Sequence, residues 1–137
     1  MSGIRSAVPG PISSPPDLML RLWPRPASCR DARRAVRAYC VECTIESLAD
    51  DAELLTSELV TNAIAHTGTM ITLVAACTNG QLVVSVRDDD IGGRNLVAAA
   101  AEATAESGRG LELVATIAGT WGMTPHADGK SVWFRLP

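Results

Sequence analysis

The sequence predicts an α+β domain in which helices pack on one face of a mostly antiparallel sheet. Its 137 residues suit a single domain. Two segments with strand-like alternation, 70–77 and 81–88, flank an Asn79-Gly80 turn, and Asn-Gly is a strong hairpin signal. Helical patterns precede this hairpin and separate it from a last strand at 131–136. Strand hairpins separated by helices are typical of the α+β class.

The first half of the chain is expected to supply one strand and two helices. Residues 18–23, LMLRLW, predict a strand that ends at the prolines that follow. Ser28 is expected to cap a helix running from about 29 to 43. A second helix is expected from about residue 50 to residue 67, where Gly68 ends it.

The second half is less regular after the hairpin. A turn-rich and then Ala-rich stretch leads to an apolar-periodic segment at 111–118, which predicts a helix. A turn with Pro125 and Gly129 then leads to the last strand, with room for a further short strand before it. The Pro-, Gly- and Ser-rich residues 1–16 are expected to form a disordered arm, which leaves 17–137 as the domain.

The composition excludes several classes of protein. A hydrophobic fraction of 47% with 20% charged residues excludes a disordered chain. No apolar run approaches the roughly 20 residues of a membrane span, and the N-terminus lacks the apolar core of a secretory signal, so we expect a cytoplasmic protein. Residues 1–40 carry seven Arg against two Asp. Four of these arginines have helical spacing, so a solvated helix face explains them and no direct nucleic-acid binding is expected.

The cysteines do not predict a metal or redox centre. Cys40 and Cys43 form a CxxC motif, but no second pair accompanies it and it lies inside a helical pattern. Reduced, buried or half-buried thiols are therefore the expected state.

Glu58 and Asn62 are the first candidate site residues. They are four positions apart, so they share one face of the second predicted helix. With Leu59 at the centre of the buried stripe, both lie at the rim between core and solvent. An Asn amide oxygen suits Mg²⁺, and a carboxylate one turn away can polarise a hydroxyl near a phosphate. The alternative is two ordinary polar residues at a helix edge.

Asp88 is the second candidate. By the two-residue period of a strand it continues the apolar row of Leu82, Val84 and Val86. A carboxylate buried there needs hydrogen-bond donors, and the exocyclic amine of adenine would supply one. The alternative is a strand-end Asp that caps a turn.

Glycine-containing segments are the third kind of candidate. Gly92 follows the strand of Asp88, and Gly108, Arg109 and Gly110 begin a predicted helix. Glycine lets a backbone approach a ligand, and helix N-terminal N–H groups attract phosphate. Ser131, near the start of the last strand, has a small hydroxyl that could reach a purine. Taken alone, each of these segments could equally be an ordinary turn with no role in binding.

Taken in order, these motifs resemble the GHKL ATP-binding family, which includes gyrase, a heat-shock chaperone and histidine kinases. The phrases that carry the resemblance are ELVTNAIAHTGT, LVVSVRDDD, SGRGLELV and GKSVWFRL. They are most similar to anti-sigma-factor serine/threonine kinases of the actinobacterial regulatory type. The resemblance covers about residues 18–136 and implies the Bergerat fold, a two-layer sandwich.

The resemblance also implies roles for individual residues. Glu58 matches the proposed general base, Asn62 the Mg²⁺ ligand and Asp88 the adenine-binding residue. The stretch from about 93 to 107 matches the lid over ATP. The glycine boxes that bind the nucleotide match Gly92, Gly108, Arg109, Gly110 and Leu111.

The function implied by the resemblance is that of an ATP- and Mg²⁺-dependent kinase that binds a sigma factor and phosphorylates a small anti-anti-sigma protein. A homodimer is expected by the same analogy. The sequence departs from the family where the first glycine box has Asp90 in place of its first glycine, and Arg94 is the only cation in the lid. Extra negative charge weakens polyphosphate binding. A non-catalytic partner-binding module with weak or no nucleotide binding is therefore the alternative.

Overall fold

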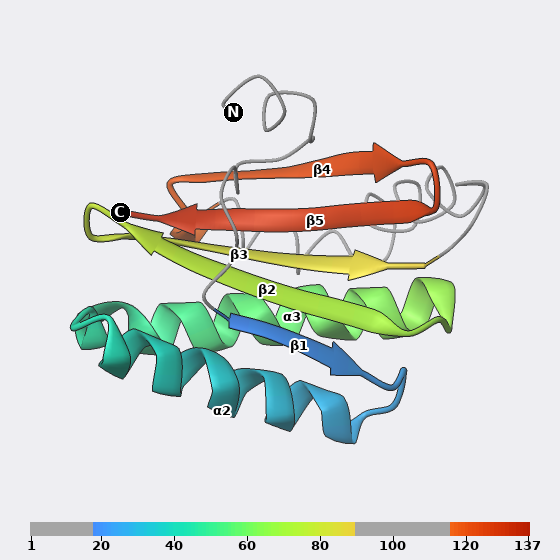
Figure 1. Ribbon diagram of the computed structural model, residues 1–137, viewed down its shortest axis with the longest axis horizontal. Coiled ribbons are helices and arrows are strands. Elements are labelled where there is room, and N and C mark those ends of the chain that lie inside the picture. The colour runs from blue at the N-terminus through green and yellow to red at the C-terminus, as the bar shows by residue number, and fades with distance from the viewer. Residues whose placement is uncertain (1–17, 90–115) are drawn as a thin grey trace.

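The computed structural model describes residues 18–89 and 116–137, and within them it has the predicted α+β architecture (Figure 1). Its sheet has the strand order β1-β2-β3-β5-β4, and every pair of neighbouring strands is antiparallel. The strands are β1 (Leu18–Leu22), β2 (Ile71–Thr78), β3 (Gln81–Asp88), β4 (Thr120–His126) and β5 (Gly129–Leu136). The expected arm at 1–16 and most of the expected helix at 111–118 lie outside the described residues.

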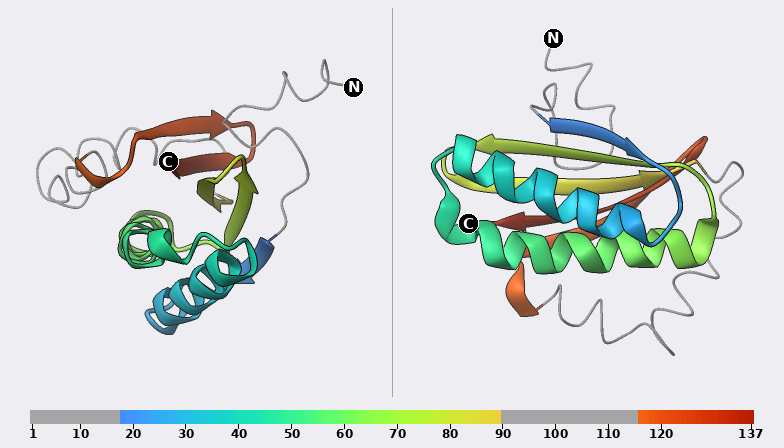
Figure 2. Two further views of the ribbon diagram at one scale, coloured as in Figure 1. Left: turned by 90° about the vertical axis from the view of Figure 1, so that its left-hand side faces the viewer. Right: turned by 90° about the horizontal axis from the view of Figure 1, so that it is seen from below.

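Both predicted helices are present, and both lie on the same face of the sheet (Figure 2). They are α2 (Ala27–Glu42) and α3 (Ala49–Thr67), separated by a short 3-10 helix, η1 (Glu46–Leu48). α3 packs over β3, β5 and β2, while α2 packs against α3 and β1. None of the described helices is both long and apolar enough to cross a membrane.

The expected Ser28 cap is wrong, because the helix begins earlier. Pro26 has helical backbone angles and stands at the N-cap position without a side-chain hydrogen bond. Proline's fixed φ suits the start of a helix. Ser28 therefore lies inside the first turn, where its hydroxyl donates to the Trp23 carbonyl at 2.6 Å.

The predicted chain reversals occur where the glycines indicated them. Gly68 ends α3 with the left-handed φ of 66°, as a helix C-terminal glycine does. Asn79 and Gly80 both have positive φ, of 54° and 76°, between the paired ends of β2 and β3. Two positive φ values match the twist of a tight hairpin.

Pro125 lies in a strand, where the sequence predicted part of a turn. Residues Thr120–His126 form β4, which pairs along its whole length with β5. Proline has no N–H to give to a sheet, so it is tolerated on an edge strand, and β4 ends the strand order. The further short strand that the sequence allowed is thus β4.

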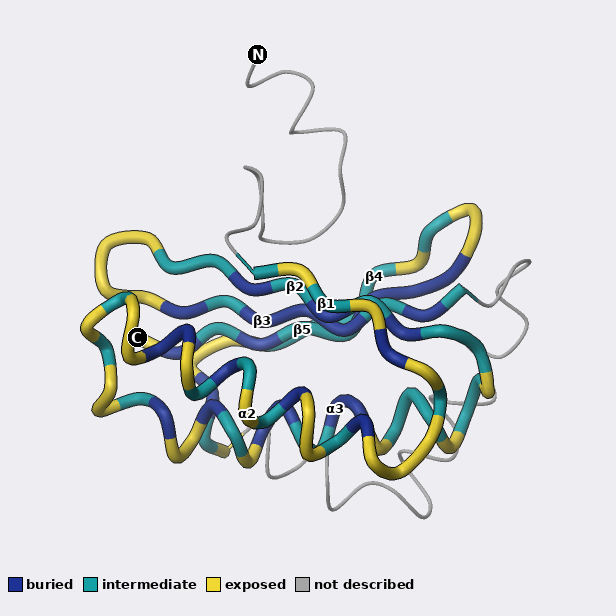
Figure 3. Tube along the Cα trace, turned by 60° about the horizontal axis from the view of Figure 1, so that its bottom comes forward, coloured by how far each residue is buried: buried dark blue, intermediate teal, exposed yellow. Residues whose placement is uncertain are grey.

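The hydrophobic core lies between the sheet and the two helices, and Figure 3 shows buried positions alternating along the strands. Leu82, Val84 and Val86 of β3 are at most 2% exposed. Phe134 and Leu136 of β5 pair with Val84 and Leu82 in register and are equally buried. This alternation fixes which β3 and β5 side chains face the helices, and so it positions the candidate site.

Candidate functional site

Asp88 ends β3 on the face that the helices cover, and its burial agrees with the alternation of the strand. It is 2% exposed and pairs in register with Ile71 of β2. The Nζ of Lys130 lies 2.6 Å from Asp88 Oδ2, and the backbone N–H of Lys130 donates to Oδ1 at 3.3 Å. The carboxylate was expected to need a donor, and Lys130 supplies two.

Gly129 explains how Lys130 comes so close to Asp88. A Cβ atom on Gly129 would lie 2.0 Å from the backbone oxygen of Asp88, and Gly129 has a φ of +155°. Only a residue without a side chain permits this approach of the two backbones. The next residue, Lys130, is consequently 5% exposed.

Sequence reasoning missed Lys130, although a signal for it was present. Val132, Phe134 and Leu136 form the helix-facing row of β5, and Lys130 stands two positions before Val132. The two-residue period therefore places Lys130 on the same face as the row that ends in Asp88. Reading β5 in this way would have indicated a buried cation beside the buried anion.

Ser131, which was expected to reach the purine, lies on the opposite face of the sheet. It pairs with Arg87 in register, and its Oγ is 2.7 Å from Nε2 of His126. Burial, and next the charge of Arg87, lower the pKa of His126. Arg87 also forms an ion pair with Asp128. Ser131 thus belongs to a polar group on the face of the sheet away from α2 and α3, and it does not share the face of Asp88.

Glu58 and Asn62 are both half-buried on α3, at the rim position that the helical period predicted. Leu59, at the centre of the buried stripe, is 1% exposed. α2 forms hydrogen bonds with Glu53 and Ser57 of α3. At 100° per residue these two lie about 120° and 160° from Leu59 in one direction round α3, and Glu58 and Asn62 lie about 100° and 60° from it in the other. Glu58 and Asn62 are therefore on the flank turned away from α2. α3 itself packs over β3 and β5, the strands that carry Asp88 and Lys130.

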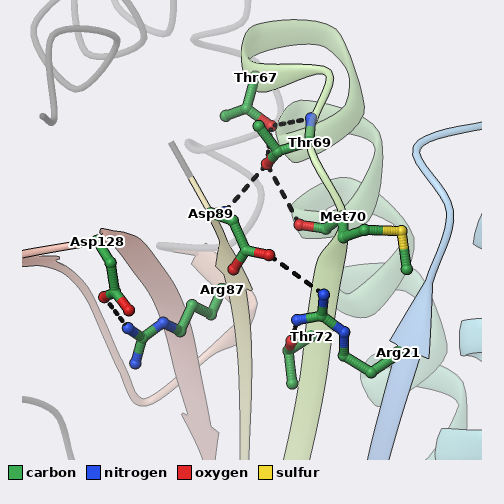
Figure 4. A network of polar contacts seen from close by, with 8 residues as sticks. All are labelled: Arg21, Thr67, Thr69, Met70, Thr72, Arg87, Asp89 and Asp128. Atoms are coloured by element: carbon green, nitrogen blue, oxygen red, sulfur yellow. Dashed lines mark hydrogen bonds and ion pairs between the residues drawn. The ribbon is translucent and has the colours of Figure 1, made fainter. Parts of the chain in front are cut away.

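Asp89, the residue after Asp88, also forms an ion pair with a cationic side chain, as Figure 4 shows. Asp89 Oδ2 accepts a hydrogen bond from Arg21 at 3.2 Å, and Arg21 also donates to Thr72 at 2.8 Å. The backbone N–H of Asp89 donates to Thr69 Oγ1 at 3.0 Å, and this hydrogen bond joins the end of β3 to the segment after α3. In the acidic run 88–90, the first two carboxylates thus each have a cationic partner.

The available donors fit Mg·ATP in part. The amide of Asn62 offers one oxygen, and Mg²⁺ commonly takes only one or two protein ligands because water and phosphate complete its octahedron. Within residues 18–89 and 116–137, no group of three or more His, Cys, Asp or Glu side chains could hold a metal ion by itself. The phosphate-binding candidates Gly92, Gly108, Arg109, Gly110 and Leu111, and the expected lid, lie outside the described residues and stay predictions.

The comparison with protein families agrees with this arrangement. The family model of the histidine kinase-like ATPase domain matches residues 22–136, so the chain belongs to this family. The match supports ATP binding in a regulatory protein as its general function. A search of curated proteins gave no significant match.

Proposed function

We propose that this protein is a Mg·ATP-dependent serine/threonine protein kinase that acts as an anti-sigma factor. The observation that carries the proposal is the buried Asp88 on the helix-covered face of the sheet, in the strand against which the helix of Glu58 and Asn62 packs. The family match over residues 22–136 supports the nucleotide-binding part. The resemblance in the motif sequences supports the kinase and anti-sigma parts.

In this proposal each residue has one task. The Asp88 carboxylate accepts a hydrogen bond from the exocyclic amine of adenine, and the Asn62 amide oxygen helps to hold Mg²⁺. Mg²⁺, when bound, supplies positive charge at the phosphates. Glu58 accepts the proton of the attacking serine or threonine hydroxyl. Such sites act mainly by positioning and charge neutralisation, so few residues are needed for phosphoryl transfer.

The proposed partners are a sigma factor and a small anti-anti-sigma protein, which compete for the kinase in the cytoplasm. Phosphorylation of the small protein would release it, so that the kinase could bind the sigma factor. We also propose a homodimer, by analogy with the same family of regulators. Sequence resemblance is the support for these partners.

The test of the proposed function separates binding from transfer. Glu58→Gln keeps the side-chain shape, so it should leave the Kd for Mg·ATP in calorimetry unchanged. It should abolish phosphate transfer from labelled ATP to a purified serine-bearing antagonist. Glu46→Gln, an exposed acid of η1, is the matched control and should retain both. Undiminished transfer by Glu58→Gln would remove Glu58 from the mechanism.

A second candidate function is a partner-binding module that uses nucleotide weakly or not at all. The observation that favours it is the Lys130 ammonium, which neutralises the buried Asp88 carboxylate from within the protein. Calorimetry at millimolar Mg·ATP distinguishes the two functions. No heat of binding from a folded protein that still binds its sigma factor would leave only this second function.

A further inference from the structure

We infer that Lys130 is an internal competitor of the nucleotide base, an inference that rests on the proposed adenine site at Asp88. Its ammonium occupies the carboxylate oxygen that the base amine would use, and the base binds as Lys130 leaves that oxygen. Lys130 would thereby set the affinity of the site for nucleotide.

The geometry shows that Lys130 engages both oxygens of one carboxylate. The Nζ–Oδ2 distance of 2.6 Å is short for a charge-assisted hydrogen bond, and the Lys130 backbone N–H reaches Oδ1. The side chains of Lys130 and Asp88 are 7% and 2% exposed. A ring the size of a purine cannot reach so covered a carboxylate unless a neighbouring group moves.

The chemistry of the two donors makes them competitors. An ammonium has three donors and no acceptor, and the exocyclic amine of adenine is likewise a donor toward Asp88. Both therefore seek the same oxygen. A lysine side chain is a point charge on a flexible four-carbon stem, so it can swing toward solvent while its backbone N–H still donates to Asp88 Oδ1.

The neighbouring ion pair, Arg21 with Asp89, does not hide its carboxylate from solvent in this way. The Arg21 and Asp89 side chains are 52% and 41% exposed, so water already reaches and screens this ion pair. Removing Arg21 therefore uncovers no hidden acceptor. Arg21 supplies a matched control for Lys130, because it is also a cation paired with an acid at the end of β3.

The chain contains a single lysine, which permits a test without mutation. The full chain would be treated with an amine-acetylating ester, with and without saturating Mg·ATP, and acetylation of Lys130 would be timed by mass spectrometry. The N-terminal amine serves as the internal reference. We expect Mg·ATP to speed acetylation of Lys130 severalfold, since displacement brings the ammonium to solvent. An unchanged rate, or a slower one as expected if Lys130 instead donated to the base, would overturn the inference.

Calorimetry with variants tests the same inference by affinity. Lys130→Gln removes the charge, so it should bind Mg·ATP about tenfold more tightly than the wild type. Lys130→Arg keeps the charge and should gain nothing, and Arg21→Gln should match the wild type. A Lys130→Gln affinity equal to or weaker than that of the wild type would contradict competition. If a urea titration shows no unfolding transition for Lys130→Gln, the variant is unfolded, and the acetylation rate of the wild type alone tests the inference.

The outcomes also separate this inference from the proposed function. Binding by the wild type with unchanged acetylation overturns the competition alone. Binding by Lys130→Gln but not by the wild type supports both, with a competitor that holds the site closed. No binding by either folded protein overturns the proposed nucleotide site and the inference with it.

Discussion

Replacing Lys130 by methionine should destabilise the protein strongly, because it leaves a buried carboxylate without its cation. The pair is almost fully covered, with side-chain exposures of 7% for Lys130 and 2% for Asp88. Removing one partner of a buried ion pair costs about 3–5 kcal/mol. Methionine keeps an unbranched stem of similar length, so the loss reports the charge and not the packing. This is a large share of the roughly 5–15 kcal/mol that stabilises a domain.

Urea unfolding followed by circular dichroism measures the loss. With a slope of about 2 kcal/mol per molar urea, Lys130→Met should lower the unfolding midpoint by about 2 M. The double variant Asp88→Asn/Lys130→Met has no uncompensated charge and should recover most of that loss. A single variant within about 0.5 M of the wild-type midpoint, or a double variant no more stable than the single one, would refute the reasoning.

Three further predictions follow from local environments. Gly129→Ala should lower the free energy of unfolding by more than about 3 kcal/mol, because its methyl group would lie 2.0 Å from the Asp88 backbone oxygen. Gly119→Ala, whose methyl group would have its nearest contact at 3.7 Å, should change that free energy by less than about 0.5 kcal/mol. Equal urea midpoints for the two variants would contradict this prediction. Burial raises the pKa of the Cys40 thiol to about 11, so a disulfide reagent at pH 8 should modify Cys40 only after unfolding; rapid modification of the native protein would disprove this. Burial lowers the pKa of His126, so the stability that its neutral form contributes is present above pH 6.5 and is lost as the pH falls below it. His126→Gln should therefore show a smaller drop in urea midpoint between about pH 7.5 and pH 5.5 than the wild type, and an equal drop would exclude this role.

Local sequence was sufficient to predict the elements that depend on neighbouring residues. The Asn79-Gly80 hairpin and the helix end at Gly68 follow from backbone angles that few residue types adopt. The inward direction of Asp88 follows from the two-residue period of its own strand, which the apolar row before it makes visible. The rim position of Glu58 and Asn62 follows in the same way from the period of a helix.

Local sequence was insufficient where a residue's environment is made by a distant segment. The expected Ser28 cap failed because proline started the helix earlier, and Pro125 joined a strand because that strand lies at an edge of the sheet. The cation that covers Asp88 comes from 42 positions further along the chain.

The sequence by itself determined that an acidic side chain would point into the core, since periodicity within one strand decides that. Only the tertiary structure decided what would face it. The pairing of β3 with β5, with Arg87 opposite Ser131, brought Lys130 to Asp88 and turned Ser131 to the other face. A buried charge takes its partner from whichever strand lies beside it, and strand pairing is set by the packing of the whole domain.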